Sequence, residues 1–184
     1  WAFYGYNLVT HFIIWHKNQA YEILFSFQLL LDMLVFLYGY LTTKADPTDR
    51  IVRLDRYCHL TKQSFDQDKY EFFCHICEAH VMEFTKHCGR CQRCTAEFDH
   101  HCVWLNNCVG KENYRLFFKL IVIVLFDTLF SVGIDVYFYI LNEDIEALVQ
   151  GILNSIVAIA VGYLIIYHIW LYFSGKTTYQ HIVE

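Results

Sequence analysis

Cysteine and histidine gather in one short stretch of this chain, between Cys74 and Cys108, where 35 residues hold seven cysteines and five histidines. Two Cys-x2-Cys pairs stand inside it, Cys74 with Cys77 and Cys88 with Cys91. Each pair lets two thiolates of one tight turn hold one metal ion, and a structural zinc site needs two further ligands. The spacing therefore predicts two interleaved zinc sites.

The further ligands must come from nearby residues that carry sulfur or imidazole. Four are available: His87, Cys94, His101 and Cys108. Two sites, each with three cysteines and one histidine, use six of the seven cysteines. Cys102 is then the thiol left over.

The spare thiol of Cys102 follows Asp99, His100 and His101 directly. In an extended segment alternate side chains face the same way, so His100 and Cys102 can share one face while His101 points toward a metal. Asp99 can hold the imidazole of His100 in one tautomer, as the acid of a catalytic triad does. A thiolate beside a histidine has a lowered pKa and is a competent nucleophile, which predicts catalysis. The spacing also allows another reading, in which these residues only fold the zinc module or Cys102 replaces another cysteine as a ligand.

The composition of the whole chain is that of a membrane protein. Of its 184 residues 56% are hydrophobic and 18% aromatic, there is a single proline, and the mean hydropathy is +0.28. The net charge of -5 and the absence of a run of Lys or Arg argue against a nucleic-acid partner.

Three apolar stretches, 21–41, 116–141 and 148–173, can each cross a hydrocarbon core, which takes about 20 helical residues. A fourth, residues 1–15, is expected to be the end of a helix truncated at its start. We therefore expect an all-α integral membrane bundle of four transmembrane helices, with a small cytosolic zinc-binding cysteine-rich domain between helices 2 and 3. The expected division is 1–41 for helices 1 (partial) and 2, 42–115 for the linker and cysteine-rich domain, 116–173 for helices 3 and 4, and 174–184 for a cytosolic C-terminal segment.

The distribution of basic residues predicts the orientation in the membrane. Residues 42–115 carry eleven of the fourteen Lys and Arg residues, and residues 142–147 carry none. Cytoplasmic loops hold the excess of these residues, so we expect the long loop and both termini to face the cytosol. Thiols stay reduced there, which favours metal binding over disulfides.

The segment also resembles the cysteine-rich domain of DHHC-type protein S-acyltransferases, and the resemblance extends over nearly the whole chain. The matching pattern is Cys74-x2-Cys77-x9-His87-Cys88-x2-Cys91-x2-Cys94-x4-Asp99-His100-His101-Cys102-x5-Cys108-x4-Asn113-x3-Phe117. Asp46-Pro47-Thr48 is similar to the family's Asp-Pro-Gly motif, with Thr48 in place of the glycine. Thr177-Thr178-Tyr179-Gln180 is similar to its Thr-Thr-x-Glu motif, with Gln180 in place of the glutamate.

The resemblance implies a ligand set for each zinc and a role for each remaining residue. One zinc is assigned to Cys74, Cys77, His87 and Cys94, and the other to Cys88, Cys91, His101 and Cys108. Cys102 becomes the nucleophile, His100 its base and Asp99 the acid that partners His100. Thr178 would support Asp99. Trp104 would either pack on the start of an acyl chain or be an ordinary interfacial tryptophan.

The implied activity is transfer of a long-chain fatty acyl group, palmitoyl above all, from acyl-CoA through a cysteine acyl-enzyme to protein thiols. The partners expected are membrane lipids, acyl-CoA, and cytosolic or membrane-associated proteins with cysteines near an endomembrane or the plasma membrane. The alternative is a catalytically weak or inactive zinc-organised membrane subunit or scaffold.

Acidic residues inside the apolar stretches are costly and mark either function or pairing within the bundle; they are Asp32, Asp127 and Asp135. For Asp127, about three turns into the third helix, we expect one of two environments. It faces the end of the acyl chain and limits its length, or it makes a polar contact between helices.

Overall fold

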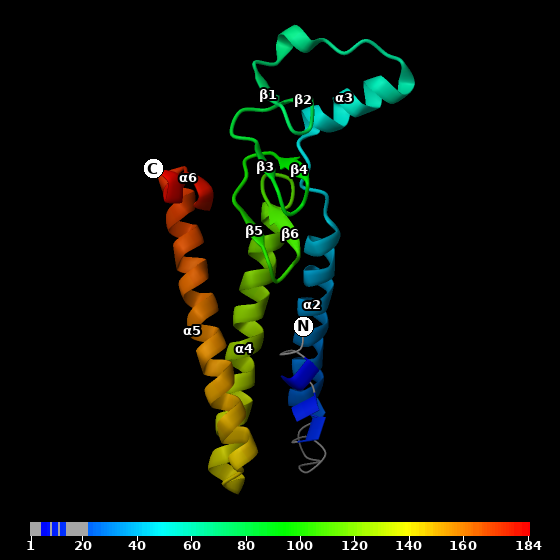
Figure 1. Ribbon diagram of the computed structural model, residues 1–184. Coiled ribbons are helices and arrows are strands. Elements are labelled where there is room, and N and C mark those ends of the chain that lie inside the picture. Colours follow the sequence, from blue (N-terminus) through cyan, green and yellow to red (C-terminus); the bar gives the residue numbers. More distant parts are fainter. Residues whose placement is uncertain (1–4, 8, 11, 14–21) are drawn as a thin grey trace. The chain divides into compact units, whose positions relative to one another are not determined.

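The computed structural model describes residues 5–7, 9, 10, 12, 13 and 22–184, and its ribbon is drawn in Figure 1. Its helices are α2 (Glu22–Lys44), α3 (Arg50–Thr61), the 3-10 turn η1 (Gln67–Lys69), α4 (Tyr114–Asn142), α5 (Ile145–Ser174) and α6 (Thr178–Val183). Six short strands form three hairpins: β1 (Phe72–Cys74) with β2 (Ala79–Val81), β3 (Lys86–Cys88) with β4 (Arg93–Thr95), and β5 (His100–Cys102) with β6 (Asn107–Val109). The chain divides into two compact units, 1–39 with 118–167 and 40–117 with 168–184.

The first unit is built from the long apolar helices α2, α4 and α5. They have 23, 29 and 30 residues, and all three are long and apolar enough to cross a membrane. They confirm that the three predicted stretches are helices of membrane-crossing length, and each helix extends a few residues beyond the stretch indicated by hydropathy. Much of the predicted first helix, residues 1–15, lies outside the described residues, and the described ones between 5 and 13 are helical. The number of four helices therefore stays a prediction.

Polar side chains inside the first unit bond one another between helices. The amide of Gln28 on α2 donates to Asp127 on α4 over 2.7 Å, and Ser131 donates back to Gln28 over 3.2 Å. Between α5 and α4, the amide of Asn154 donates to Asp135 over 2.9 Å. Because hydrocarbon offers no hydrogen bonds, such pairs fix helix contacts and their register. Of the two environments expected for Asp127, the bond from Gln28 shows the second, a polar contact between helices.

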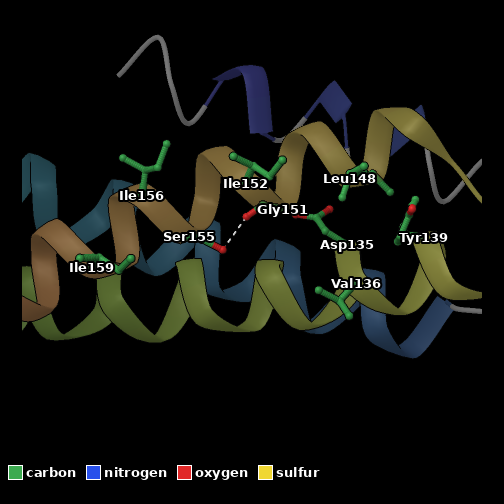
Figure 2. Close-up of a pocket in the computed structure, with 10 residues that line it drawn as sticks. Asp135, Val136, Tyr139, Leu148, Gly151, Ile152, Ser155, Ile156 and Ile159 are labelled. Atoms are coloured by element: carbon green, nitrogen blue, oxygen red, sulfur yellow. Dashed lines mark hydrogen bonds between the residues drawn. The ribbon is translucent and has the colours of Figure 1, made fainter.

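A small apolar cavity of about 280 Å³ lies between α4 and α5. Figure 2 shows Asp135, Val136 and Tyr139 of α4 and residues between Leu148 and Ile159 of α5 around it. Gly151 faces Asp135, and a Cβ there would stand 3.2 Å from the Asp135 Cβ. The small residue thus lets the two helices approach beside the Asp135–Asn154 bond.

The second unit contains α3. This helix was not predicted from the sequence, and its residues were assigned to the linker before the cysteine-rich domain. Asp49 caps its start, accepting from the main chain of Ile51 over 2.7 Å. Its other carboxylate oxygen accepts from the main chain of Met82 over 2.8 Å and from the Thr85 hydroxyl over 2.5 Å. One capping residue therefore both starts the helix and ties it to the hairpins. On the buried face of α3, Val52 packs among residues of the hairpins: Ala79, Val81 and Cys94, with Cys74 and Cys77 at the edge.

The three hairpins are antiparallel pairs of three residues each, coloured green in Figure 1. Asn107 at the start of β6 ties the last hairpin to the end of α2. Its amide nitrogen lies 3.1, 3.1 and 2.8 Å from the carbonyl oxygens of Thr42, Thr43 and Ala45. Thr42 and Thr43 are among the last four residues of α2, whose carbonyls have no partner within a helix, so Asn107 acts as a cap of the helix end.

Gly110, just after β6, passes so close to another turn that a side chain has no room. A Cβ at this position would stand 2.5 Å from Thr95 Cγ2 and 2.6 Å from the main-chain oxygen of Ala96. Asn113 holds the same turn, accepting from the Gly110 N–H over 3.0 Å and donating to the Cys108 carbonyl over 2.8 Å. The turn leads directly into α4.

We expect Gly110→Ala to destabilise the second unit, because the main chain at Ala96 must move to admit a methyl group. Overpacking of this kind costs about 1–3 kcal/mol. Gly89→Ala is the matched control, since nothing lies within 4 Å of a Cβ there. Thermal unfolding of the purified chain, followed with release of bound metal, measures both variants. Equal midpoints for the two would contradict the close packing at Gly110.

Candidate active site and metal centres

The first group of metal-ligand residues joins β1 to the second hairpin. Cys74 is the last residue of β1 and Cys77 lies in the turn after it, while His87 faces Cys94 across the β3–β4 pair. Nδ1 of His87 lies 4.0, 3.3 and 3.9 Å from the sulfur atoms of Cys74, Cys77 and Cys94.

The second group repeats this construction one hairpin further along the chain. Cys88 is the last residue of β3 and Cys91 lies in the turn after it, while His101 faces Cys108 across the β5–β6 pair. Nδ1 of His101 lies 3.7, 3.3 and 3.8 Å from the sulfur atoms of Cys88, Cys91 and Cys108.

Both groups have the dimensions of a tetrahedral metal site. Within each group the four ligand atoms lie within 4.8 Å of one another. With zinc bonds of about 2.3 Å to sulfur and 2.0–2.1 Å to nitrogen, two ligands of a tetrahedral site stand roughly 3.6 Å apart. Each group can therefore hold one metal ion, and these are the two sets of four that the family resemblance implied.

His100 lies between an acid and a thiol. Its Nδ1 is 2.7 Å from a carboxylate oxygen of Asp99, and the ring also hydrogen-bonds the Cys102 thiol. Because Nδ1 is engaged with Asp99, Nε2 is the ring nitrogen that can bond the Cys102 thiol. The structure thus brings together the three residues that the sequence selected as catalytic candidates.

Asp99 is buried and is held by the segment after α5. One of its oxygens accepts from the main-chain N–H of Thr178 over 2.9 Å, and the other accepts from the Thr178 hydroxyl over 2.8 Å. Burial raises the pKa of Asp99, but the bonds from His100 and Thr178 outweigh it and bring that pKa below its usual value. Asp99 is therefore a carboxylate that can fix the orientation of His100.

The positions of Thr178 and Tyr179 follow from a cap at the start of α6. Thr177 and Gln180 form a reciprocal capping box, in which the Gln180 side chain accepts from the Thr177 N–H over 2.8 Å. An amide oxygen fills this role as well as a carboxylate does. Tyr179 packs edge-on against Phe98, with ring centroids 5.7 Å apart, and the Lys86 ammonium lies over the Tyr179 ring.

The electrostatics favour a thiolate beside an imidazolium. Burial lowers the pKa of His100, but its bonds to Asp99 and Cys102 outweigh this and raise that pKa to about 9. Burial raises the pKa of the Cys102 thiol, but the hydrogen bond from His100 and two main-chain N–H groups of the following turn bring it below its usual value. Each group thus stabilises the charged form of the other.

An aromatic cluster beside His100 is a feature that the sequence did not single out. The Phe117 ring meets the His100 ring edge-on at 5.3 Å, and the His168 ring of α5 lies 6.2 Å from it. His168 is buried, and its Nδ1 is 2.9 Å from the Tyr114 hydroxyl. His168 is a lone histidine within an apolar stretch, which was a signal in the sequence. Its neighbours Tyr114 and Phe117 could not be predicted, because they lie about 50 residues away in the chain.

Trp104 does not join the buried part of the site. Its side chain is 83% exposed, although it is two residues from Cys102. This leaves open both predicted roles, contact with an acyl chain and an interfacial position in the membrane.

A model of the DHHC palmitoyltransferase family matches residues 67–184, which is more than half of the chain. The chain belongs to this family. The DHHC match begins before the first metal-ligand cysteine and runs through α4 and α5 to the last residue.

Individual DHHC proteins of known name are similar over much of the chain. The palmitoyltransferase ZDHHC15A of Danio rerio is 33% identical over 117 residues, 59% of this chain and 36% of the relative. The palmitoyltransferase ZDHHC18-A of Danio rerio is 34% identical over 134 residues, 71% of this chain and 25% of the relative. The probable protein S-acyltransferase 20 of Arabidopsis thaliana is 31% identical over 134 residues, 60% of this chain and 19% of the relative. The chain therefore spans about a third of these relatives or less.

The neighbours His100 and His101 should respond differently to substitution. His101→Ala removes a ligand atom of the second metal group, so metal content should fall from two equivalents to about one and the hairpins should loosen. His100→Ala removes no ligand and should keep both equivalents. Metal analysis of the purified variants by mass spectrometry measures this, and equal metal content in the two would contradict the division of roles.

The pKa directions also predict how the reactivity of Cys102 depends on pH. The thiolate forms as the pH rises through the lowered pKa of Cys102, while His100 stays protonated up to about pH 9. The rate at which iodoacetamide alkylates Cys102 should therefore reach half its maximum at a pH below about 8.5, the usual pKa of a thiol. In Asp99→Asn the imidazolium loses its partner, so the half-maximal pH should rise. The measurement is mass spectrometry of the Cys102 peptide from metal-loaded protein, and an unchanged profile in Asp99→Asn would refute the coupling.

Proposed function

We propose that this chain carries the catalytic core of a protein S-acyltransferase that moves a long-chain fatty acyl group, palmitoyl above all, onto protein cysteines. The observation that carries the proposal is the line from Asp99 through His100 to the Cys102 thiol, within a chain of the DHHC family. The acid orients the base, and the base acts on the thiol of Cys102. Of the seven cysteines between Cys74 and Cys108, Cys102 is the one that belongs to neither metal group.

In the first step the Cys102 thiolate attacks the carbonyl carbon of a fatty acyl-CoA. A bond from Cys102 sulfur to that carbon forms, the bond from carbon to the CoA sulfur breaks, and the imidazolium of His100 gives its proton to the departing CoA thiolate. The products are free CoA and a thioester on Cys102. His100 is now neutral and still bonded to Asp99.

In the second step His100 works as a base. It takes the proton of a cysteine thiol in the protein substrate, and that sulfur attacks the carbonyl carbon of the Cys102 thioester. The bond to Cys102 breaks, and Cys102 leaves as a thiolate beside the imidazolium. The enzyme thus returns to its starting state without a net change in protons.

The metal in both groups is proposed to be zinc with a structural role. Three thiolates and one imidazole are a typical ligand set for tetrahedral zinc. All four positions in each group are filled by protein side chains, which leaves none for a water or a substrate. Zinc would hold His101 and thereby the strand that carries His100 and Cys102.

The proposed setting is an endomembrane or the plasma membrane, with the hairpins on the cytosolic side. The distribution of Lys and Arg supports this orientation, and three helices of sufficient length support the membrane. The acyl chain would be drawn there by burial of its methylene groups, each worth about 0.8 kcal/mol. The proposed substrates are proteins with cysteines near that surface.

The test is formation of the acyl-enzyme by the purified chain in detergent or nanodiscs. Incubated with an alkyne-tagged palmitoyl-CoA, wild type should acquire one label that neutral hydroxylamine removes, as it does thioesters. Cys102→Ser should lose the hydroxylamine-sensitive label while keeping both metal equivalents, and Cys58→Ser, at a buried cysteine of α3 outside both metal groups, should keep it.

Each other outcome has a distinct meaning. Loss of one metal equivalent in Cys102→Ser would make Cys102 a ligand and end its assignment as nucleophile. A wild-type protein that holds two metals but takes no label would instead be the inactive scaffold. His100→Ala should slow labelling by about 10²–10⁴-fold, the usual contribution of an acid–base group.

A further inference from the structure

The three hairpins are copies of one unit that recurs every 14 residues. Their central cross-strand pairs fall at matching positions: Phe73 with His80, His87 with Cys94, and His101 with Cys108. In each turn the same position has a left-handed backbone: Glu78 at φ 49°, Gln92 at φ 51° and Asn106 at φ 47°. Non-glycine residues rarely adopt this conformation. Its recurrence at one place shows that the three turns share one shape.

The metal groups use this repeat in a staggered way. Each group combines the Cys-x2-Cys turn of one hairpin with the cross-strand histidine and cysteine of the next. The turn of the first hairpin is completed by the pair of the second, and the turn of the second by the pair of the third. In the part of the chain that the structure describes, no further hairpin follows to complete the turn of the third hairpin, and this turn belongs to neither metal group.

Cys102 stands in that third turn at the position of a metal ligand. It follows the central strand residue directly, as Cys74 and Cys88 do in their hairpins. The second ligand position, three residues later, holds cysteine in the first two turns, at Cys77 and Cys91. In the third turn it holds Leu105, which is buried.

The main-chain hydrogen bonds to sulfur are the same in all three turns. The sulfur of Cys88 accepts from the N–H groups two and three residues later, at Arg90 and Cys91, and Cys74 does so in the first turn. Cys102 likewise accepts from Trp104 and Leu105. The backbone that holds a metal-bound thiolate in the first two hairpins thus holds the Cys102 sulfur in the third.

We propose that the turn from Cys102 to Leu105 is a metal knuckle without its second thiolate, and that Leu105 determines its use by keeping metal away from the Cys102 sulfur. The main-chain N–H groups of Trp104 and Leu105 position that sulfur. The description of Cys102 as a nucleophile rests on the proposed function, but the geometry of the turn does not.

Ligand counting explains why Leu105 is decisive. As it stands, the turn offers a metal ion two ligands, the Cys102 thiolate and the His100 imidazole. A thiolate at position 105 would make three, and two cysteines with one histidine are a sufficient protein set for zinc with one position open. Asp99 already bonds the other nitrogen of His100, which is the arrangement that orients histidine ligands of zinc. A second thiolate at position 105 would therefore let the turn bind a metal ion through the Cys102 sulfur.

The experiment compares Leu105→Cys with Leu105→Ser, which removes the same packing but adds no strong ligand. Metal-loaded chains of all 184 residues are titrated with Cd²⁺. Bound metal is counted, and its binding is followed by the thiolate-to-cadmium charge-transfer absorption. Leu105→Cys should bind three equivalents, and Leu105→Ser and wild type two. The third equivalent should disappear in Leu105→Cys combined with Cys102→Ser. In labelling with tagged palmitoyl-CoA, Leu105→Cys should lose activity in proportion to the third equivalent bound.

Two equivalents in a folded Leu105→Cys, equal to Leu105→Ser at saturating Cd²⁺, would overturn the proposal. If Leu105→Cys does not retain its first two equivalents, Leu105→His supplies an imidazole with a volume closer to leucine, and the same count applies to it. Metal counting needs no acyl transfer, so a chain that takes no label can still bind the third equivalent. Conversely, an active wild type whose variants bind only two equivalents refutes the knuckle and leaves the proposed function intact.

Discussion

Alternation along the three residues of β5 is the constraint on which the site depends. His101 faces one side, where it stands opposite Cys108 and beside Cys88 and Cys91. His100 and Cys102 face the other side, toward Asp99. A metal ion bound on one face would therefore fix the rotation of the strand, and that rotation would set the orientation of His100 and Cys102 on the other face. A shift of register by one residue would exchange the two faces and leave neither complete.

A second tie comes from the far end of the chain. Asp99 is one residue before β5, and it accepts two hydrogen bonds from Thr178 at the start of α6. Because Asp99 is buried, its charge depends on those donors. The capping box of Thr177 and Gln180 fixes the backbone that presents them. The substitution of glutamine for glutamate at this position keeps the box, since the box requires an acceptor oxygen and not a charge.

The sequence predicted the parts of the fold that depend on local spacing. Hydropathy located α2, α4 and α5, and the spacing of Cys88, Cys91, His101 and Cys108 indicated residues that the structure does bring together. It missed α3, whose helical state depends on Asp49 bonding both the helix start and the distant Met82. The aspartate before a helix was a usable signal, but the tertiary bond was not visible. His168 was missed for the same reason, because its partners Tyr114 and Phe117 are distant in sequence.

The hairpins have little stability of their own, so the position of the proposed nucleophile Cys102 depends on the metal groups. Strands of three residues are too short to be stable alone, and the buried cluster around the second metal group consists largely of ligand sulfurs, with Phe98 as its main apolar side chain. A metal ion bound by each group would then supply much of the folding free energy of this region, as it does in small zinc modules. The sulfur of Cys102 is held by the same kind of turn as the ligands, but its place in the repeat lies one step beyond the last pair that could complete a metal site. In the proposed function this thiol is free to react because the repeat ends there, with Leu105 where a second thiolate ligand would stand.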